Sequence, residues 1–272
     1  MIYDEMLDFL LQILISEAKD FRKATIPKDN ARRRDLLRSL MNLRPPIPIS
    51  SDFLGVQDKL LSLERERKDI TDPNILPSIK EQFPNSNISF ADKLVLWKGD
   101  ITTLAADAIV NAANSKLLGC FVPHHRCIDN AIHSAAGIQL RLECNEIMEK
   151  QGYDEPTGQA KITQGYNLPA RYVLHTIGPI IYEEVTEEDK RLLASCYTAC
   201  LNLAAGYKKI KSVAFCSIST GEFRFPKELA VHIAVQAVSE WQENSNGRFD
   251  RIIFNVFTDE DHEIYAGLFR ES

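Results

Sequence analysis

The chain has 272 residues, of which 44% are hydrophobic and 26% are charged. This balance is typical of a soluble globular protein that is long enough to bury its own core. The net charge of -6 argues against binding to nucleic acid through a broad basic face. It permits a small electropositive cleft for a phosphate-bearing ligand.

No segment has the run of about eighteen apolar residues that a membrane-spanning helix needs. Residues 1–5 include two acidic side chains, whereas the start of a secretory signal is basic. We therefore expect a cytoplasmic protein with neither membrane nor nucleic acid as a partner. In that compartment the six cysteines are expected to be reduced thiols or metal ligands.

The first third of the chain shows helical patterns. Apolar residues repeat at helical spacing over residues 6–14, and residues 31–43 form a second, arginine-rich amphipathic pattern. Prolines follow the second pattern and end it. A serine cap predicts a third helix over about residues 50–69. We expect a mainly helical N-terminal extension over residues 1–89.

From residue 90 onward, short apolar runs alternate with helical patterns, which predicts strands separated by helices. The expected strands are 94–97, 108–111, 172–176, 212–218 and 251–257, and the expected helices are 129–150, 187–206 and 227–243. Strands that are apolar throughout imply a sheet covered on both faces. Residues 90–272 are therefore predicted to form a three-layer α/β/α domain, with its ligand at the carboxyl ends of the strands.

Two loops that follow strands carry residues suited to a nucleotide ligand. Asp100 either accepts a hydrogen bond from an amino group or caps a short helix. In the loop from Ser219 to Phe223, Gly221 would let backbone amides approach an anion. The ring of Phe223 either lies against a sugar or packs in the core. An ordinary turn explains either loop when it is taken alone.

A third loop concentrates thiols and imidazoles. Cys120, His124, His125 and Cys127 lie within eight residues, and zinc binds thiolate and imidazole readily. The simplest set is Cys120, His125 and Cys127, which leaves a fourth position for water or substrate, as in catalytic zinc sites. Alternatively, His124 replaces His125 or completes a closed structural site, or the loop binds no metal and its cysteines are buried as small hydrophobic residues.

The remaining cysteines lie in helical or strand patterns, where we expect buried thiols without nearby ligand partners. They are Cys144, Cys196, Cys200 and Cys216. His133 and His175 also lie in such patterns, and both are predicted to be structural histidines rather than metal ligands.

Several blocks of the sequence resemble the macrodomain family, which binds ADP-ribose and in many members hydrolyses its links to proteins. The blocks occur in the family's order and are residues 99–102, 107–114, 132–137, 157–158, 175–179 and 219–221. The resemblance covers about residues 90–270. It implies a macrodomain fold with a central mixed sheet.

The resemblance also implies a role for each matching residue. Asp100 would hold the adenine amine, with Ile101 beside it. Asn114 would contact the distal ribose and, with Asp129, belong to the catalytic site. The loop around the diphosphate would consist of Ser219, Thr220, Gly221, Glu222 and Phe223.

The sequence departs from common macrodomains between Gly119 and Cys127, where many hydrolytic members have a run of glycines. Here the pattern is similar to a zinc-dependent subgroup, in which a cysteine, a histidine and a second cysteine bind the ion. Members of that subgroup also carry a helical N-terminal extension. Some are encoded beside a sirtuin-type ADP-ribosyltransferase and a lipoyl-carrier protein, which the resemblance suggests as a modified partner. Glu222 and Arg224 replace small residues of many relatives.

These features predict a Zn²⁺-dependent hydrolase that removes mono-ADP-ribose from the ester-linked Asp or Glu side chains of modified proteins. The resemblance places Asp129 beside the scissile bond, where it would orient or deprotonate water. Asp129 could also be a helix N-cap, and the two roles could coexist. Two other functions fit the same loops: a non-catalytic ADP-ribose reader with a structural zinc, and a deacetylase of O-acetyl-ADP-ribose. An RNA-binding zinc module is disfavoured by the acidic charge.

Overall fold

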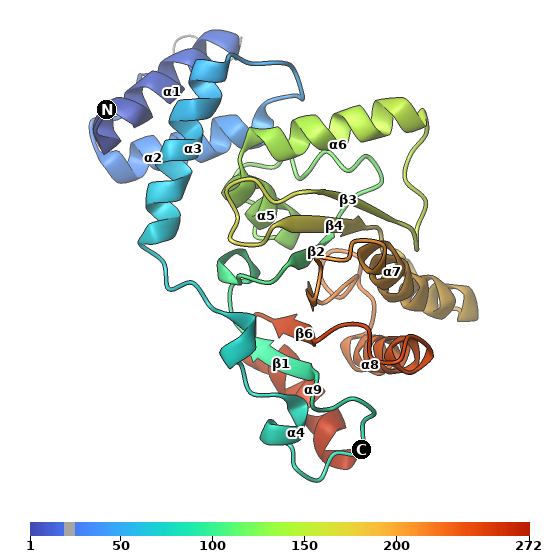
Figure 1. Ribbon diagram of the computed structural model, residues 1–272. Helices are drawn as coiled ribbons and strands as arrows, with labels where there is room; N and C mark the ends of the chain where they lie inside the picture. The colour runs from blue at the N-terminus through green and yellow to red at the C-terminus, as the bar shows by residue number, and fades with distance from the viewer. Residues whose placement is uncertain (19–24) are drawn as a thin grey trace.

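A computed structural model describes residues 1–18 and 25–272 of the chain. Figure 1 shows the N-terminal helices at one end of the molecule, beside α5 and α6, and the C-terminus at the opposite end. The sheet lies between them. The two ends of the chain therefore belong to different parts of the structure, a helical bundle and a sheet domain.

Three helices form the N-terminal bundle: α1 (Tyr3–Glu17), α2 (Asn30–Leu43) and α3 (Ser51–Glu66). Their apolar faces pack into a core of their own, which Ile138 of the sheet domain joins. Asp29 caps α2 and Ser50 caps α3, each with a side-chain oxygen that accepts from a backbone amide. All three predicted helices of this region are confirmed.

Six strands form one mixed sheet in the order β1-β6-β5-β2-β4-β3. Only the β3–β4 pair is antiparallel among these six. The bounds are β1 (Leu94–Lys98), β2 (Ala108–Ala112), β3 (Ala160–Gln164), β4 (Tyr172–Thr176), β5 (Ser212–Phe215) and β6 (Arg251–Val256). The mixed sheet is as expected. The prediction extended β5 to residue 218, but the strand ends at Phe215 because the chain turns into a loop there.

Two of the predicted elements differ from the structure, and one strand and one long helix were not predicted. The helix expected over 129–150 is broken at Gly137, whose φ of 95° is left-handed. Strand β3 lies at the sheet edge and has one fully buried residue, so it shows no apolar run. The C-terminal helix α9 (Asp259–Glu271) also went unpredicted.

Helices cover both faces of the sheet, which confirms the three layers (Figure 1). They are α5 (Ile128–Ala136) and α6 (Ile138–Gln151), which pack together on one face, and α7 (Glu187–Ala205), α8 (Lys227–Asn244) and α9, which pack in a row on the other. None of the helices in the described ranges is both long and apolar enough to cross a membrane.

The segment between the bundle and β1 packs with the sheet domain. Thr71 forms a parallel bridge to Leu104, and Ile79 of the short helix α4 (Ile79–Gln82) belongs to the core beneath the sheet. The amide of Asn87 donates to the carbonyl of Ser272. The helical core of the bundle therefore ends with α3, before the predicted boundary at residue 89.

Candidate functional site

A cavity of about 660 Å³ opens at the carboxyl ends of β2, β4, β5 and β6. Ligands of open α/β sheets bind at this edge, because loops from several parallel strands converge there. The cavity is lined mainly by residues from four stretches, 112–129, 216–223, 255–257 and 261, together with Gly178. The loop of residues 118–127, which we name the cysteine loop, forms one wall.

A buried carboxylate lies in this wall. Asp129 is 5% exposed, and its Oδ1 accepts a hydrogen bond from Asn111 Nδ2 at 2.8 Å. Asn114 Nδ2 donates to the other oxygen at 3.4 Å and to the carbonyl of Gly119 at 3.1 Å. Burial raises the pKa of Asp129 to about 6, although the two amides oppose this shift. The alternative assignment of Asp129 as an N-cap is wrong, because Cys127 occupies the cap of α5.

The cysteine loop brings three possible metal ligands together. The Sγ atoms of Cys120 and Cys127 and a ring nitrogen of His125 all lie within 4.8 Å of one another. The distance from Cys120 Sγ to His125 Nδ1 is 3.6 Å. Burial raises the pKa of the Cys127 thiol to about 12. A cation between the sulfurs would reverse that shift, since thiolates are the form that binds metals.

The two adjacent histidines point to different partners. His124 Nε2 lies 2.7 Å from Ser39 Oγ of α2, away from the two cysteines. His125 Nε2 lies 3.4 Å from Glu222 Oε1, while its Nδ1 faces Cys120. The geometry therefore favours His125 over His124 as the imidazole of a three-ligand set.

The loop from Ser219 to Phe223 forms the opposite wall. Ser219 has a φ of 65°, and its buried Oγ has no hydrogen-bond partner among the described residues. A Cβ at Gly221 would meet nothing within 4 Å, so the backbone there is open to a ligand. The ring of Phe223 packs against the core, as one of the two predictions has it, and it also lines the cavity, where the contact with a sugar stays a prediction.

Two predicted substrate-binding residues lie outside the cavity lining. Asp100 caps the short helix η3 (Ile101–Thr103) by accepting from the amide of Thr102 at 2.9 Å, and Ile101 is buried. Asp100 instead borders a smaller cavity of about 180 Å³ against α2 and α3. Asn255 connects this loop to the main cavity, because it lines the cavity and donates to the carbonyl of Gly99 at 2.9 Å.

Residues 110–234 match the Macro domain family. Over 260 residues the chain is 48% identical to the Protein-ADP-ribose hydrolase of Treponema medium, which covers 96% of each chain. The chain belongs to the macrodomain family. This macrodomain is also 44% identical over 264 residues to the Protein-ADP-ribose hydrolase of Staphylococcus aureus strain MSSA476, covering 97% of its own length and 94% of the relative's. Both matches include the helical bundle.

Solved macrodomain structures share the fold. The Trypanosoma brucei macrodomain in complex with ADP-ribose superimposes with a TM-score of 0.64 and 29% identity, covering 84% of this macrodomain and 94% of that chain. The Oceanobacillus iheyensis macrodomain with ADP gives a TM-score of 0.59 and 37% identity, covering 69% and 93%. The fold of this chain thus belongs to a known architecture.

The sequence analysis missed several residues that line the cavity of this macrodomain. Phe257 is 76% exposed and follows directly on β6, at the same sheet edge as the cysteine loop. A large aromatic residue just beyond a buried strand is a usable signal, because the carboxyl ends of parallel strands meet at one edge. The missed polar residues with long or charged side chains include Lys116, Arg126, Asn255 and Asp261.

A second cluster of possible ligands lies in the core of the macrodomain. His133, Cys144 and His175 are buried, with one ligand atom of each within 4.8 Å of the others. The expectation that Cys144 has no nearby ligand partners is therefore wrong, because residues distant in sequence meet there. His175 contacts Thr163 Oγ1 through Nε2 at 2.9 Å, and burial lowers its pKa to about 3. The other three cysteines predicted to be buried are buried.

Proposed function

We propose that this macrodomain is a hydrolase that releases ADP-ribose from modified proteins. The observation that carries the proposal is the meeting of Asp129, Asn114 and the Cys120–His125–Cys127 cluster on one wall of the main cavity. A reader needs only a binding surface, whereas a buried carboxylate beside a metal-type donor set is a catalytic arrangement. Relatives of nearly the same length carry the name Protein-ADP-ribose hydrolase.

The substrate bond that we propose is an ester between an Asp or Glu side chain and the anomeric carbon of ADP-ribose. A carboxylate leaves readily because its conjugate acid has a pKa of about 4, whereas a serine alkoxide is a much poorer leaving group. As the protein substrate, we propose a lipoyl-carrier protein that a sirtuin-type transferase has modified. The family resemblance supports this choice.

The donor set of Cys120, His125 and Cys127 fits Zn²⁺, which prefers thiolate and imidazole ligands. When bound, the ion would supply Lewis-acid chemistry at the distal-ribose end of the cavity. Glu222 would orient the histidine ligand. Its carboxylate faces His125 Nε2, so that Nδ1 is directed toward the cysteines.

Asp129 would serve as the general base. With a pKa of about 6 it is ionised at neutral pH and still able to take a proton from water. The water oxygen attacks the anomeric carbon, the bond to the side-chain carboxylate breaks, and the carboxylate leaves with the electron pair. The proton of the water passes to Asp129. Asn111 and Asn114 hold the carboxylate in place.

The Ser219 loop would hold the diphosphate. Ser219 Oγ is buried and lacks a partner in the described chain, so it can donate to a phosphate oxygen. The open backbone at Gly221 lets amides approach the same group. These contacts position the ribose without taking part in bond cleavage.

The test is ADP-ribose release from an aspartate-linked ADP-ribosylated protein, measured with Zn²⁺-loaded and chelator-stripped enzyme side by side. A serine-linked substrate and the Asp129→Ala variant serve as controls. We expect turnover of the aspartate-linked substrate alone, its loss with the metal, and its return on re-addition. ADP-ribose binding without turnover in either sample would make the protein a reader. Equal activity after complete metal removal would exclude the metal-dependent mechanism.

A further inference from the structure

The helical bundle contacts the back of the cysteine loop, on the side away from the main cavity. Asn42 in the last turn of α2 is 2% exposed. Its Oδ1 accepts hydrogen bonds from the backbone amide of His124 at 3.3 Å and from Asn130 Nδ2 at 3.1 Å. Its Nδ2 donates to Ser134 Oγ at 3.1 Å. One side chain of the bundle thus bonds both to the loop and to the helix that follows it.

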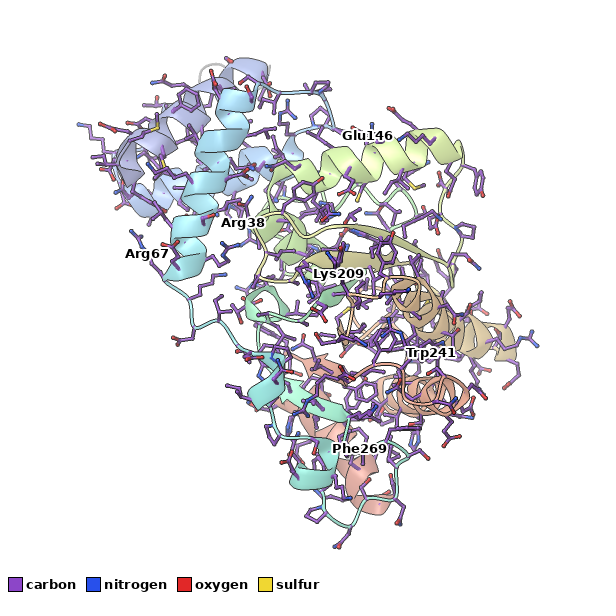
Figure 2. The ribbon with its side chains drawn as sticks, in the orientation of Figure 1. Arg38, Arg67, Glu146, Lys209, Trp241 and Phe269 are labelled. Atoms are coloured by element: carbon purple, nitrogen blue, oxygen red, sulfur yellow. The ribbon has the colours of Figure 1, made fainter. Side chains whose placement is uncertain are left out.

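Asn130 extends this contact to the thiol. Its Nδ2 also donates to the carbonyl of Val122 at 3.0 Å, and its backbone amide donates to Cys127 Sγ at 3.4 Å. Arg38 of α2 donates to Asn130 Oδ1 at 2.8 Å. Figure 2 shows Arg38 at the junction between the bundle and α5. A continuous set of hydrogen bonds therefore runs from α2 to a proposed metal ligand.

Arg141 of α6 fastens the start of the loop to the end of α2. Its Nε donates to the carbonyl of Leu118 at 2.6 Å, and its Nη1 donates to three carbonyls at the end of α2. The guanidinium lies 4.3 Å from the centre of the Phe121 ring. Burial lowers the pKa of Arg141 to about 10, so it stays charged at neutral pH and complements the helix dipole.

The cysteine loop needs such support because its backbone is strained. His124 has a φ of 56°, a left-handed conformation that side-chain-bearing residues adopt only when their surroundings impose it. The backbone amide of His124 donates to Asn42 Oδ1, and the His124 ring contacts Ser39, which lies in α2 like Asn42. The strained turn separates the two cysteines and directly precedes His125.

We propose that Asn42 is a positioning residue that holds the cysteine loop in its metal-binding conformation, so the helical bundle is a working part of the site. The inference rests on the proposed function for the identity of the metal. Without the side-chain amide of Asn42, the backbone amide of His124 loses its hydrogen-bond acceptor in the bundle. The three ligands then spend less time within reach of one ion.

The test compares Asn42→Ala with Gln57→Ala. Gln57 is a matched control because it is a fully buried amide of the bundle whose Oε1 accepts from the amide of Ile138 at 3.0 Å, at the start of α6 and outside the loop. The Zn²⁺ dissociation constant is measured by competition with a chromogenic chelator. We expect Asn42→Ala to weaken Zn²⁺ binding about tenfold, the usual effect of removing an outer-shell partner. Gln57→Ala should stay within about twofold of the unmodified protein.

Two further readouts separate positioning from general stability. Thermal unfolding should show both variants losing stability, whereas the thiolate-to-metal absorption of the Co²⁺-loaded protein should change only in Asn42→Ala. In the metal-free protein, amide exchange over residues 118–127 should be faster in Asn42→Ala and unchanged in Gln57→Ala. Equal Zn²⁺ affinity and equal loop exchange in the two variants would overturn the inference.

Failure of the proposed function gives a different result. If the unmodified protein binds no Zn²⁺, the proposal that Cys120, His125 and Cys127 hold this ion is wrong. The exchange experiment still decides whether Asn42 holds the loop, because it is carried out on metal-free protein.

Discussion

The protein contains two clusters of cysteine and histidine with similar spacing and different surroundings. In each, one ligand atom from every residue lies within 4.8 Å of the others. The first, Cys120, His125 and Cys127, lines a cavity on a loop and is half-buried. The second, His133, Cys144 and His175, is fully buried between α5, α6 and β4. Proximity of donors is therefore common to both and does not distinguish a metal site from a core.

The distinction lies first in access. The polar partners of His175 add to it, whereas the ring nitrogens of His133 have no hydrogen-bond partner in the described chain. Both nitrogens of His175 already face polar groups, Thr163 at 2.9 Å and Asn111 at 3.2 Å. Burial raises the pKa of the Cys144 thiol well above its usual value. Cys144 lies within helix α6, whereas the cavity cluster lies on a loop that can fold around an ion. The cavity cluster has open solvent on one side, and the amide of Asn130 donates to Cys127.

The largest difference is expected from a matched pair of cysteine substitutions. Cys127→Ala removes a ligand, so bound Zn²⁺ should be lost and turnover should fall by more than about 10²-fold, beyond the effect of an outer-shell change. Cys144→Ala should keep the metal content and cost about 1 kcal/mol of stability, as for a small cavity in a core. Metal analysis, turnover and denaturant unfolding check both variants. Loss of zinc from the Cys144 variant would reverse the assignment of the two clusters.

The core cluster should respond to protons instead of metal. Burial lowers the pKa of His175 to about 3, against about 6.5 in the unfolded chain. Between these values the unfolded state binds a proton that the native state does not, so stability is complete above pH 6.5 and is lost as pH falls toward 3. His175 is expected to contribute about 1.4 kcal/mol per pH unit to the slope, and His133 adds to it because burial lowers its pKa as well. His175→Asn should be less stable at pH 7 but should show a flatter pH dependence in urea unfolding. An unchanged slope would contradict the assignment.

Gly119 connects the two clusters, and its replacement should affect both. It has a φ of 77°, and a Cβ there would lie 2.8 Å from the ring of His133. Gly119→Ala is expected to cost about 2 kcal/mol, from backbone strain and the clash together. Zn²⁺ binding should weaken as well, because Cys120 is the next residue. The open Gly221, where a Cβ meets nothing, is the control position for stability.

The smallest effect is expected at Glu222. Its carboxylate faces His125 Nε2 at 3.4 Å, but the side chain is largely exposed, so water can replace it. Glu222→Gln should keep the metal and weaken Zn²⁺ binding by about two- to threefold, below the usual range for outer-shell partners. The chelator competition assay measures this. A tenfold loss would show that the carboxylate fixes the histidine more firmly than its exposure suggests.

The cluster that the sequence analysis predicted is the one built from neighbouring residues. Cys120, His125 and Cys127 lie within eight positions, so their meeting needs only a loop. The core cluster brings together residues from two helices and a strand, and Asn42 meets Asn130 across 88 positions. Such pairs leave no local pattern, because each residue alone satisfies the rules for an ordinary helix or strand.

In the fold as well, elements with a local sequence pattern were predicted and those without one were missed. The helices of the bundle and most strands were predicted because burial of one face, or of both, imposes a period on the residues. Strand β3 has one fully buried residue at the sheet edge and shows no such period. Asp100 was correctly recognised as a possible cap, but the shape of the cavity around it depends on α2 and α3, which lie far away in sequence.

The hydrogen bonds of Arg141 have a consequence for the order of assembly. One guanidinium joins the carbonyl of Leu118 to three carbonyls at the end of α2, and α2 precedes it by about a hundred residues. A ribosome delivers the chain from its N-terminus, so the bundle leaves the exit tunnel before the loop that it supports. Arg141 follows the cysteine loop in the chain, so the loop is fastened to α2 only once α6 has also been made. The order of synthesis therefore leaves the two cysteines of the loop without this support until α6 is in place.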